Sequence, residues 1–474
     1  MSSKRLFSKT PNGTWEASSS SADRLSSLDR NLLLHILTFL PYKSAVATSL
    51  LSSAWRDLWL HRWSHPHSHL RLTSSHDADR FLSLLRPLPL RLDSLHLSSS
   101  SFSSADPLLR LAADLQLQDL SLEAPAFADS PNLIPLPPSL VRLTLYNLWI
   151  PIPFSSPLAS LQTLNLHSVS LSDEALADLV SSAYLLKTLE LRRCRGLRHV
   201  RIPGDGLWLE NVVVAECGGI SRIRIKTRRM RRFHFSGEFC ETYAMERVAR
   251  VELEDVYMSC GGKVPMLPRK NWYKAITRPW FVRVMTICHV FLRYIAESGD
   301  YRNFERLKEL QLLLAKIDKQ CLMDICSFFG LCRCNGLEKL FIELPMDAND
   351  MENEDLEHID QQQHLSGTFT NLKTIKINNF KGRTYEMLLV RILLWKATSL
   401  DSLMITTHHP NMGGNSSTRE EVDRRHHADH PNLLNFLRLE LSSMVKSSSN
   451  AEIIVRDHDD YRFRPTHHEI YSMV

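Results

Sequence analysis

Residues 23–63 read DRLSSLDRNLLLHILTFLPYKSAVATSLLSSAWRDLWLHRW, and the rest of the chain is organised around this stretch. Large apolar residues recur three or four positions apart between Leu25 and Leu40, which is the spacing of one face of an α-helix. We expect Ser26 or Ser27 to cap this helix, and Pro41 to end it because proline has no backbone N–H to donate.

Two shorter helices are predicted after the proline. The first covers residues 44–51, and the second carries Trp55, Leu58 and Trp59 at helical spacing. Three small helices cannot bury this many large apolar side chains among themselves, and burying each one stabilises a structure by roughly 1.5–3 kcal/mol. The stretch is therefore predicted to be a helical docking module whose exposed remainder is covered by a partner.

Three pieces of the module, DRLSSL, LLLHILTFLPYKSAVATSLLS and WRDLW, resemble the F-box in the version common in plant proteins. The resemblance implies that the module binds the Skp-family adaptor of a cullin–RING ubiquitin ligase. Some of its apolar side chains must instead hold the module together. The candidate adaptor contacts are Leu25, Leu28, Leu32, Leu33, Ile36, Leu37, Leu40, Leu50, Trp55 and Trp59.

The module departs from the F-box pattern in two places. The family usually has Leu-Pro-Asp at the start of the first helix, where this chain has Asp29 and Arg30 after Leu28. It also usually has a basic pair before the tryptophan, where this chain has Ser53 and Ala54. Two other interpretations therefore stay open: an interaction scaffold with a weakened F-box, and a short amphipathic bundle packed on the next domain.

A unit of the form LxxLxL repeats along the chain after the module. The period of its clear copies is the signature of leucine-rich repeats, and the alternating apolar positions suit a short strand with one buried face. Because each unit buries its apolar edge only against its neighbours, we expect a curved solenoid with a shared parallel sheet. The first six copies begin at Leu92, Leu117, Leu140, Leu161, Leu186 and Leu209, with gaps of 25, 23, 21, 25 and 23 residues.

Later units are less regular. Those at Leu209, Ile220 and Met230 are only 11 and 10 residues apart, which leaves no room for a helix and predicts strand–turn–strand. Another unit is predicted on Val248, Val251 and Leu253, and units resume more irregularly at Leu307, Leu337, Leu372 and Leu400.

The C-terminal region has a resemblance of its own. FTNLKTIKINNFKGRTYEMLLVRILLWKATSLDSLMITT, followed by SSSNAEIIVRD, is similar to the FBD region that ends many plant F-box/leucine-rich-repeat proteins. The pattern predicts strand, helix, strand. The apolar face of the helix is predicted to carry Tyr385, Leu388, Leu389, Ile392 and Leu393.

The predicted fold class is α/β, with a short helical F-box followed by an irregular leucine-rich-repeat solenoid. The predicted layout is a disordered tail at 1–22, the F-box at 23–63, a linker at 64–89, the repeats at 90–364 and the FBD-like region at 365–474. Within the repeats we expect an insertion near 255–303, with a helix at 277–296, and an acidic loop at 347–360.

Composition places the chain among soluble globular proteins. Of its 474 residues, 43% are hydrophobic and 23% charged, and the net charge of +5 is too small to imply nucleic acid by itself. Nine scattered cysteines favour free thiols in a reducing compartment. The apolar stretch 280–295 is too short and too charged to span a bilayer, and the N-terminus lacks the apolar core of a secretory signal. We expect a cytoplasmic or nuclear protein without membrane contact.

The motifs of an enzyme are missing. A RING needs Cys and His ligands in CxxC-type pairs, and this chain has no CxxC; Cys321 and Cys326, like Cys332 and Cys334, are expected to be core thiols. No GxxxxGK[ST] phosphate loop and no GxSxG elbow occurs. We therefore predict no catalytic residue, no metal and no cofactor.

A basic run, RIRIKTRRMRR at residues 222–232, is the sharpest functional feature of the repeats. Clustered arginines bind carboxylate or phosphate groups bidentately, so the run is a candidate site for an acidic or phosphorylated target segment. A solvated basic face, a localisation signal and an intramolecular contact with the acidic loop remain alternatives. Nucleic acid is unlikely because few aromatic residues are interleaved. The candidate residues are Arg192, Arg222, Arg224, Lys226, Arg228 and Arg229.

The outward position within each LxL is a second candidate surface. Mixed side chains on a rigid sheet suit protein recognition. In chain order the position carries His96, Ser121, Thr144, Asn165, Glu190, Val213, Arg224, His234, Glu252, Gln311, Phe341, Lys376 and Met404.

These features predict a non-catalytic substrate receptor. The F-box would dock on the Skp-family adaptor and, through it, on the cullin–RING ligase, while the repeats and the C-terminal region hold an unknown target protein. The rival classes are the scaffold with a weakened F-box and a nucleic-acid-associated repeat protein.

Overall fold

The computed structural model divides the chain into two compact units. One contains residues 1–148 and 154–161, and the other contains 149–153 and 162–474. The structure describes residues 8–9, 15–16, 25, 27–64, 69–72, 92–98, 116–128, 136–150, 158–202, 208–227, 229–240, 242–247, 253–261, 282–297, 302–346, 368–407, 434–457 and 463–468.

The first unit begins with a short strand pair and the helical module. Strands β1 (Ser8–Lys9) and β2 (Trp15–Glu16) pair antiparallel, inside the stretch predicted to be a disordered tail. The helices are α1 (Arg30–Thr38), α2 (Tyr42–Ala47) and α3 (Leu58–His61), with 3₁₀ turns η1 (Thr48–Leu50) and η2 (Arg62–Ser64).

Helix α1 is capped by a residue that the sequence pattern did not indicate. Asp29 Oδ2 accepts a hydrogen bond from the Asn31 backbone N–H at 3.0 Å. The prediction that Ser26 or Ser27 caps the helix is wrong, because the helix begins at Arg30, directly after Asp29. An aspartate at this position satisfies one of the free N–H groups of the first turn.

A parallel sheet follows the module in the first unit. Its strands are β3 (His69–Leu72), β4 (Ser94–Ser98), β5 (Asp119–Ala128) and β6 (Arg142–Ile150), paired so that equivalent leucines of successive repeats align. Strand β3 lies within the predicted linker 64–89. The sheet therefore starts one strand before the first predicted repeat.

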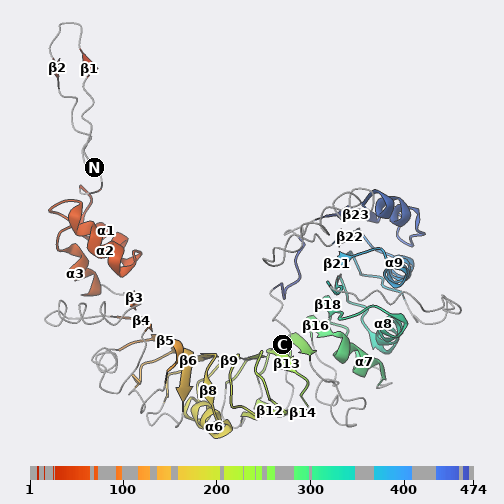
Figure 1. Ribbon diagram of the computed structural model, residues 1–474, viewed down its shortest axis with the longest axis horizontal. Coiled ribbons are helices and arrows are strands. Elements are labelled where there is room, and N and C mark those ends of the chain that lie inside the picture. The colour runs from red at the N-terminus through yellow and green to blue at the C-terminus, as the bar shows by residue number, and fades with distance from the viewer. Residues whose placement is uncertain are drawn as a thin grey trace, which may run out of the picture. The chain divides into compact units, whose positions relative to one another are not determined.

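The second unit continues the repeats as parallel strands. Figure 1 shows the helices α6 (Asp173–Ser182), α7 (His289–Glu297), α8 (Lys319–Leu331) and α9 (Thr384–Lys396) on one side of these strands. The strands, in spatial order, are β7 (Thr163–His167), β9 (Thr188–Arg192), β11 (Asn211–Ala215), β13 (Arg232–Glu238), β15 (Asp255–Gly261), β16 (Val284–Cys288), β18 (Glu309–Leu313), β20 (Lys339–Glu343), β21 (Thr374–Phe380), β22 (Ser402–Thr407) and β23 (Glu452–Arg456).

Shorter strands lie beside this sheet. They are β8 (Ser170–Leu171), β17 (Arg302–Asn303) and β19 (Cys332–Arg333), of which β17 and β19 pair with each other. A second parallel sheet is made by β10 (His199–Ile202), β12 (Arg222–Thr227) and β14 (Thr242–Arg247).

This second sheet explains the close spacing at Leu209, Ile220 and Met230. The units that follow Leu209 and Met230 form β11 and β13 of the main sheet, whereas the unit that follows Ile220 forms β12 of the second sheet. Strand–turn–strand without a helix is confirmed here. The placement of Arg224 in the outward row of the main sheet is wrong.

The predicted insertion 255–303 contains two strands of the main sheet. The apolar pattern runs through Leu253, Val256 and Met258 rather than ending at Leu253, and β15 forms on it. Residues Val284–Cys288 form β16, so the helix predicted at 277–296 is shorter and begins only at His289. The acidic loop 347–360 lies outside the described residues, as do Val248 and Val251.

The FBD-like region has the predicted strand–helix–strand order. Helix α9 buries Leu388, Leu389 and Leu393 as expected, with Tyr385 and Ile392 half-buried. Strands β21, β22 and β23 continue the sheet beyond β20. A helix at 434–443 packs Leu437 and Leu441 into the core.

All nine cysteines are free and buried. The core positions of Cys321, Cys326, Cys332 and Cys334 are thus confirmed. Among the described residues no helix has both the length and the apolar composition needed to cross a membrane.

Candidate functional site

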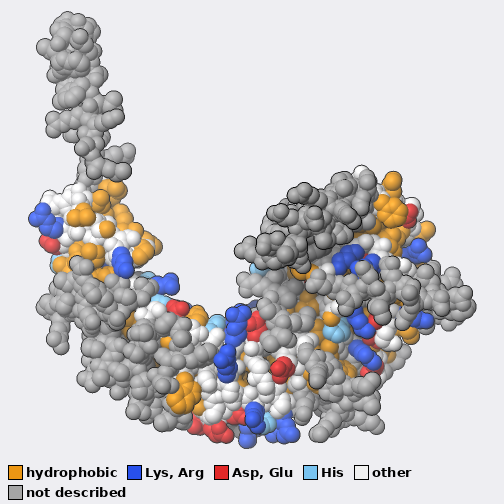
Figure 2. Space-filling view, in the orientation of Figure 1, with side chains coloured by type: hydrophobic (Ala, Val, Ile, Leu, Met, Phe, Trp, Pro, Cys, Tyr) orange, Lys and Arg blue, Asp and Glu red, His pale blue; other side chains and the backbone are white. Residues whose placement is uncertain are grey.

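The helical module presents an apolar surface. Leu25 is 57% exposed, Leu32 is 52% exposed and Leu50 is 88% exposed, and Leu28 is also exposed. Figure 2 shows hydrophobic side chains gathered on this module. Ile36 and Leu40 are half-buried. These six of the predicted adaptor contacts lie where a second protein could reach them.

The other predicted adaptor contacts form the module's own core. Leu33, Leu37, Trp55 and Trp59 are buried, and Tyr42 packs its ring edge-on against Trp59. These four are the members of the predicted set that hold the module together, because a buried side chain offers little area to a partner. Leu33 and Leu37 are one turn apart on the inner face of α1, whereas Leu32 lies on its outer face.

Two exposed residues were missed. Phe39 is 75% exposed and follows α1 directly, seven positions after Leu32 and therefore on the same helical face. Leu51 is exposed beside Leu50. The spacing of Phe39 was a usable signal; Leu51 had none, because η1 is a single 3₁₀ turn.

A buried arginine links the module to the first strand of the sheet. Arg62 Nη1 donates to the Leu40 carbonyl oxygen at 2.8 Å, and Nη2 donates to the carbonyl oxygen of His69 at 3.3 Å. Its guanidinium carbon lies 4.2 Å from the centroid of the Trp63 ring. Burial lowers the pKa of Arg62 to about 10, so the side chain remains charged at neutral pH.

The predicted basic site is divided between separate surfaces. Arg192 ends β9 of the main sheet and pairs with Glu190. Arg222, Arg224 and Lys226 lie on β12 of the second sheet. Arg228 lies outside the described residues. The structure therefore does not bring Arg192 together with the residues of β12.

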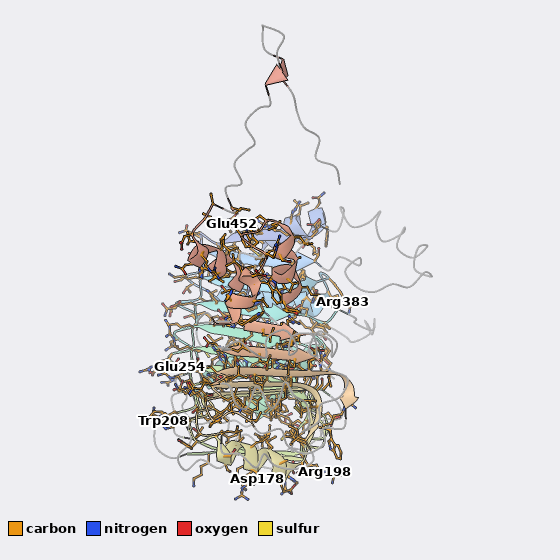
Figure 3. The ribbon with its side chains drawn as sticks, turned by 90° about the vertical axis from the view of Figure 1, so that its left-hand side faces the viewer. Asp178, Arg198, Trp208, Glu254, Arg383 and Glu452 are labelled. Atoms are coloured by element: carbon orange, nitrogen blue, oxygen red, sulfur yellow. The ribbon has the colours of Figure 1, made fainter. Side chains whose placement is uncertain are left out.

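Arg229 belongs to a third location. Its guanidinium carbon lies 3.5 Å from the centroid of the Trp208 ring. Figure 3 shows Trp208 and Glu254, which precede β11 and β15, at one edge of the strand stack, and Arg383, which follows β21, at the opposite edge. Stacking on an aromatic face fixes the direction of this guanidinium.

The second sheet has basic residues in register. Arg201 on β10 aligns with Arg224 on β12, and His199 aligns with Arg222. Arg201, Arg222 and Arg224 are exposed. The acidic side chain of Asp173, at the start of α6, accepts from the backbone N–H of His199. This surface is a smaller basic patch than the sequence suggested, but it gains Arg201, which sequence reasoning missed.

The outward row of the main sheet is continuous in the second unit. Each of its members aligns with the next by strand register, and each is buried. Arg224 lies on β12 instead, the predicted Glu252 lies outside the described residues, and Tyr257 and Thr286 occupy the row on β15 and β16. We define the outward row as Val213, His234, Tyr257, Thr286, Gln311, Phe341, Lys376 and Met404.

Residues 463–468 of the same chain contact the outward row. Lys376 Nζ donates to the Phe463 carbonyl oxygen at 2.8 Å. The Thr466 N–H donates to Glu309 Oε1, at the start of β18. His467 Nδ1 lies 2.7 Å from Thr286 Oγ1, which itself donates to Gln311. No motif in the sequence indicates this contact.

His467 completes a buried cluster with His234 and Asp255. His467 Nε2 lies 2.6 Å from Asp255 Oδ1, and His234 Nε2 lies 3.0 Å from the same oxygen. Arg232 Nε donates to the other carboxylate oxygen at 2.7 Å. Two imidazoles and a carboxylate within 4.8 Å of one another are a donor set that could hold a metal, although none was predicted from the sequence.

The electrostatics of the cluster follow from this geometry. Burial acts to raise the pKa of Asp255, but the hydrogen bonds to His234 and His467 outweigh it and hold the pKa of this carboxyl below its usual range. Burial lowers the pKa of His234, and the bond to Asp255 offsets this only in part. The carboxylate is therefore ionised and His234 neutral at pH 7.

Comparison with known proteins finds a match for the helical module and another for the repeats. A sequence model of the F-box domain matches residues 25–67. A model of the At1g61320/AtMIF1 leucine-rich-repeat domain matches residues 90–432, which is more than half of the chain. F-box/leucine-rich-repeat proteins are in general non-catalytic adaptors with a role in substrate recognition.

Relatives from Arabidopsis thaliana have the same domain names. The chain is 34% identical over 191 residues to a putative F-box/FBD/LRR-repeat protein, At4g00315, covering 36% of this chain and 43% of the relative. It is 30% identical over 182 residues to the putative F-box/LRR-repeat protein At3g18150, covering 37% and 39%. These two matches span about two fifths of each relative.

A longer match is more distant. The F-box/FBD/LRR-repeat protein At5g18770 is 24% identical over 420 residues, covering 82% of this chain and 86% of the relative. The name of that relative combines the F-box, the FBD and the leucine-rich repeats. The chain belongs to the family of plant F-box proteins with leucine-rich repeats of the At1g61320/AtMIF1 type, and it carries an FBD-like C-terminal region.

Proposed function

We propose that the chain is the substrate-recognition subunit of an SCF-type cullin–RING E3 ubiquitin ligase. The observation that carries this proposal is the apolar surface of the F-box, formed by Leu25, Leu28, Leu32, Phe39 and Leu50. Clustered exposed groups of this kind mark a protein interface. Burying each one is worth roughly 1.5–3 kcal/mol, which favours a partner that covers them together.

In this function the chain itself performs no chemistry. Residues 23–63 dock on the Skp-family adaptor, while residues 90–364 and 365–474 hold a target protein. The cullin and its RING partner bring a ubiquitin-charged E2, and the receptor raises the local concentration of the target's lysines beside it. The site of action is the cytoplasm or the nucleus.

The departure from the F-box pattern at Asp29 does not by itself argue against docking. Asp29 caps α1, so the change from the usual residues still supports a stable first helix. Arg30 is exposed at the same end. A scaffold with a weakened F-box would share this geometry but lack measurable affinity for the adaptor.

An adaptor pull-down tests the proposal. The wild-type chain is expected to capture a purified Skp-family adaptor, and Leu32→Glu should abolish capture by placing a charge in the buried interface. Leu439→Glu is the matched control, because Leu439 is an exposed leucine on the helix at 434–443, far along the sequence from the F-box. A wild-type chain that ignores the adaptor, or equal capture by both variants, would remove the proposal.

A further inference from the structure

The outward row is buried although nothing in a repeat array requires it to be. Side chains alternate between the two faces of a strand, so those that point away from the helices normally face solvent. Here Tyr257, Thr286 and Lys376 are at most 1% exposed. Lys376 and the neighbouring Glu309 are charged groups, and burying them without partners would be costly.

Residues 463–468 supply partners to both charged groups, in addition to Lys339 Nζ, which lies 3.9 Å from Glu309 Oε2. Two of the contacts are to backbone atoms: Lys376 binds the Phe463 carbonyl oxygen, and Glu309 accepts from the Thr466 N–H. His467 contributes its side chain, which lies between Asp255 and Thr286. Hydrogen bonds to the peptide backbone do not depend on which side chains the peptide carries. The contacts to the imidazole of His467 do, so they make the arrangement selective for histidine at that position.

The contacts of this segment follow the order of the strands. Phe463 meets β21, Thr466 meets β18, and His467 meets β16 and β15. The backbone bends at Phe463 and turns at Thr466 and His467, and this turn directs the imidazole into the row.

We infer that the outward row is a binding site for a short peptide segment with a histidine, and that residues 463–468 occupy it in cis. Asp255 and Thr286 take the two nitrogens of the imidazole, while Glu309 and Lys376 take the peptide backbone. A target segment of the same kind binds by displacing residues 463–468. This rests on the proposed function only in that the displacing peptide belongs to a target protein.

Hydrogen bonding explains the cluster better than a bound metal ion does. Ligand atoms at tetrahedral zinc, each about 2.0–2.1 Å from the ion, lie about 3.3 Å from one another. The 2.6 Å and 3.0 Å separations from Asp255 Oδ1 are shorter than this and are ordinary for charge-assisted hydrogen bonds. The imidazole is thus recognised by the carboxylate directly.

Fluorescence polarisation with a labelled peptide tests the inference. The probe is YRFRPTHHEI, the sequence of residues 461–470, added to the full-length chain. His467→Ala in the chain weakens the cis occupant, so this variant should bind the probe about tenfold more tightly than wild type does. His468→Ala is the matched control, because His468 is exposed, and it should bind like wild type.

Two further arms place the probe in the site. A probe with alanine at the position of His467 should lose binding to the His467→Ala chain. Adding Asp255→Asn or Thr286→Val to that chain should also abolish probe binding. Thr286→Val keeps the shape of the side chain, so it serves as the test if Asp255→Asn unfolds the sheet. Thermal unfolding of each variant reports whether it is folded.

The inference is overturned if His467→Ala binds the probe no better than His468→Ala. It is also overturned if binding appears only with added Zn²⁺ and disappears with EDTA, which would make the cluster a metal centre. Adaptor capture is measured on the same samples. If the chain binds the probe but not the adaptor, the peptide site stands and the ubiquitin-ligase proposal is overturned. If it captures the adaptor but does not bind the probe, the ubiquitin-ligase proposal stands and the peptide site is overturned.

Discussion

Arg62 Nη1 lies 2.8 Å from the carbonyl oxygen of Leu40, and this bond joins the end of the F-box module to the end of its first helix. Leu40 lies just past the end of α1, where carbonyl groups have no partner within the helix. The same guanidinium reaches the His69 carbonyl of β3. A single side chain therefore satisfies the end of the first helix and attaches the module to the repeat sheet of the first unit.

Arg62→Ala is expected to destabilise the F-box by about 2–4 kcal/mol. The change leaves buried carbonyl groups without a donor and removes the packing on Trp63. Denaturant unfolding followed by tryptophan fluorescence would measure the loss. Arg56→Ala is the control, since Arg56 is exposed on the same module. Equal stability of the two variants would mean that the Arg62 bonds contribute nothing net.

The two faces of α1 should respond differently to truncation. Leu37→Ala removes a fully buried side chain and should cost about 2–5 kcal/mol in the free energy of unfolding. Leu32→Ala, one turn away on the exposed face, should change stability by less than about 0.5 kcal/mol while weakening adaptor capture. If Leu32→Ala unfolds the module as well, the exposed face is structural.

Much of the fold could be predicted because the leucines of a repeat are all buried only when the repeat forms a strand beside the strands of its neighbours. Leu189 and Leu191 alternate across a strand, and the same spacing recurs in each neighbouring unit. Prediction failed where a second set of apolar residues matched the repeat pattern at a shifted position in the sequence. Val248 and Val251 suggested a unit that ends at Leu253, whereas the strand follows Leu253 and uses Val256 and Met258.

The strand β16 was missed for a related reason. Val284–Cys288 runs without a break into the apolar helix α7, so the whole stretch resembled one helix. The cluster at His467 could not have been predicted at all. His467 and Asp255 are 212 residues apart, and no local pattern records a contact at that separation.

Gly196→Ala should destabilise the repeats by about 1–3 kcal/mol. Gly196 has φ +87°, and a Cβ there would lie 2.7 Å from the Leu171 carbonyl oxygen, which is backbone and cannot move aside cheaply. Gly218→Ala is the matched control, because a Cβ at Gly218 meets nothing within 4 Å. Thermal unfolding should separate the two variants; matched midpoints would show that the turn at Gly196 relaxes.

The basic patch on the second sheet should bind anions independently of the outward row. Replacing Arg222, Arg224 and Lys226 with serine should reduce the affinity for an acidic or phosphorylated peptide and the salt dependence of that binding. Binding of the YRFRPTHHEI probe should not change, because β12 belongs to a different sheet. Arg192→Ser is the control on the main sheet. Unchanged anion affinity in the triple variant would remove the patch from consideration.

The stability of the folded chain should fall between pH 6.5 and pH 5 through His234. Its pKa in the folded protein lies below its ordinary value, with burial as the largest cause and the bond to Asp255 acting in the opposite direction. The unfolded chain therefore binds more protons below about pH 6.5, and stability decreases as the pH falls. Asp255, whose pKa is lowered, loses its contribution only below its unfolded value of about 3.9.

His234→Gln isolates this effect. The groups facing His234 are Asp255, His467, Arg232 and Tyr257, and all of them remain in the variant. The titration of every other histidine in the unfolded chain is common to both proteins and cancels in the comparison. Denaturant unfolding at pH 7.5 and pH 5 should show a smaller loss of stability in His234→Gln than in wild type. Equal losses of unfolding free energy in the two proteins would contradict the prediction. They would mean that protonating His234 hardly destabilises the folded chain, and that its burial does not control the charge of the cluster.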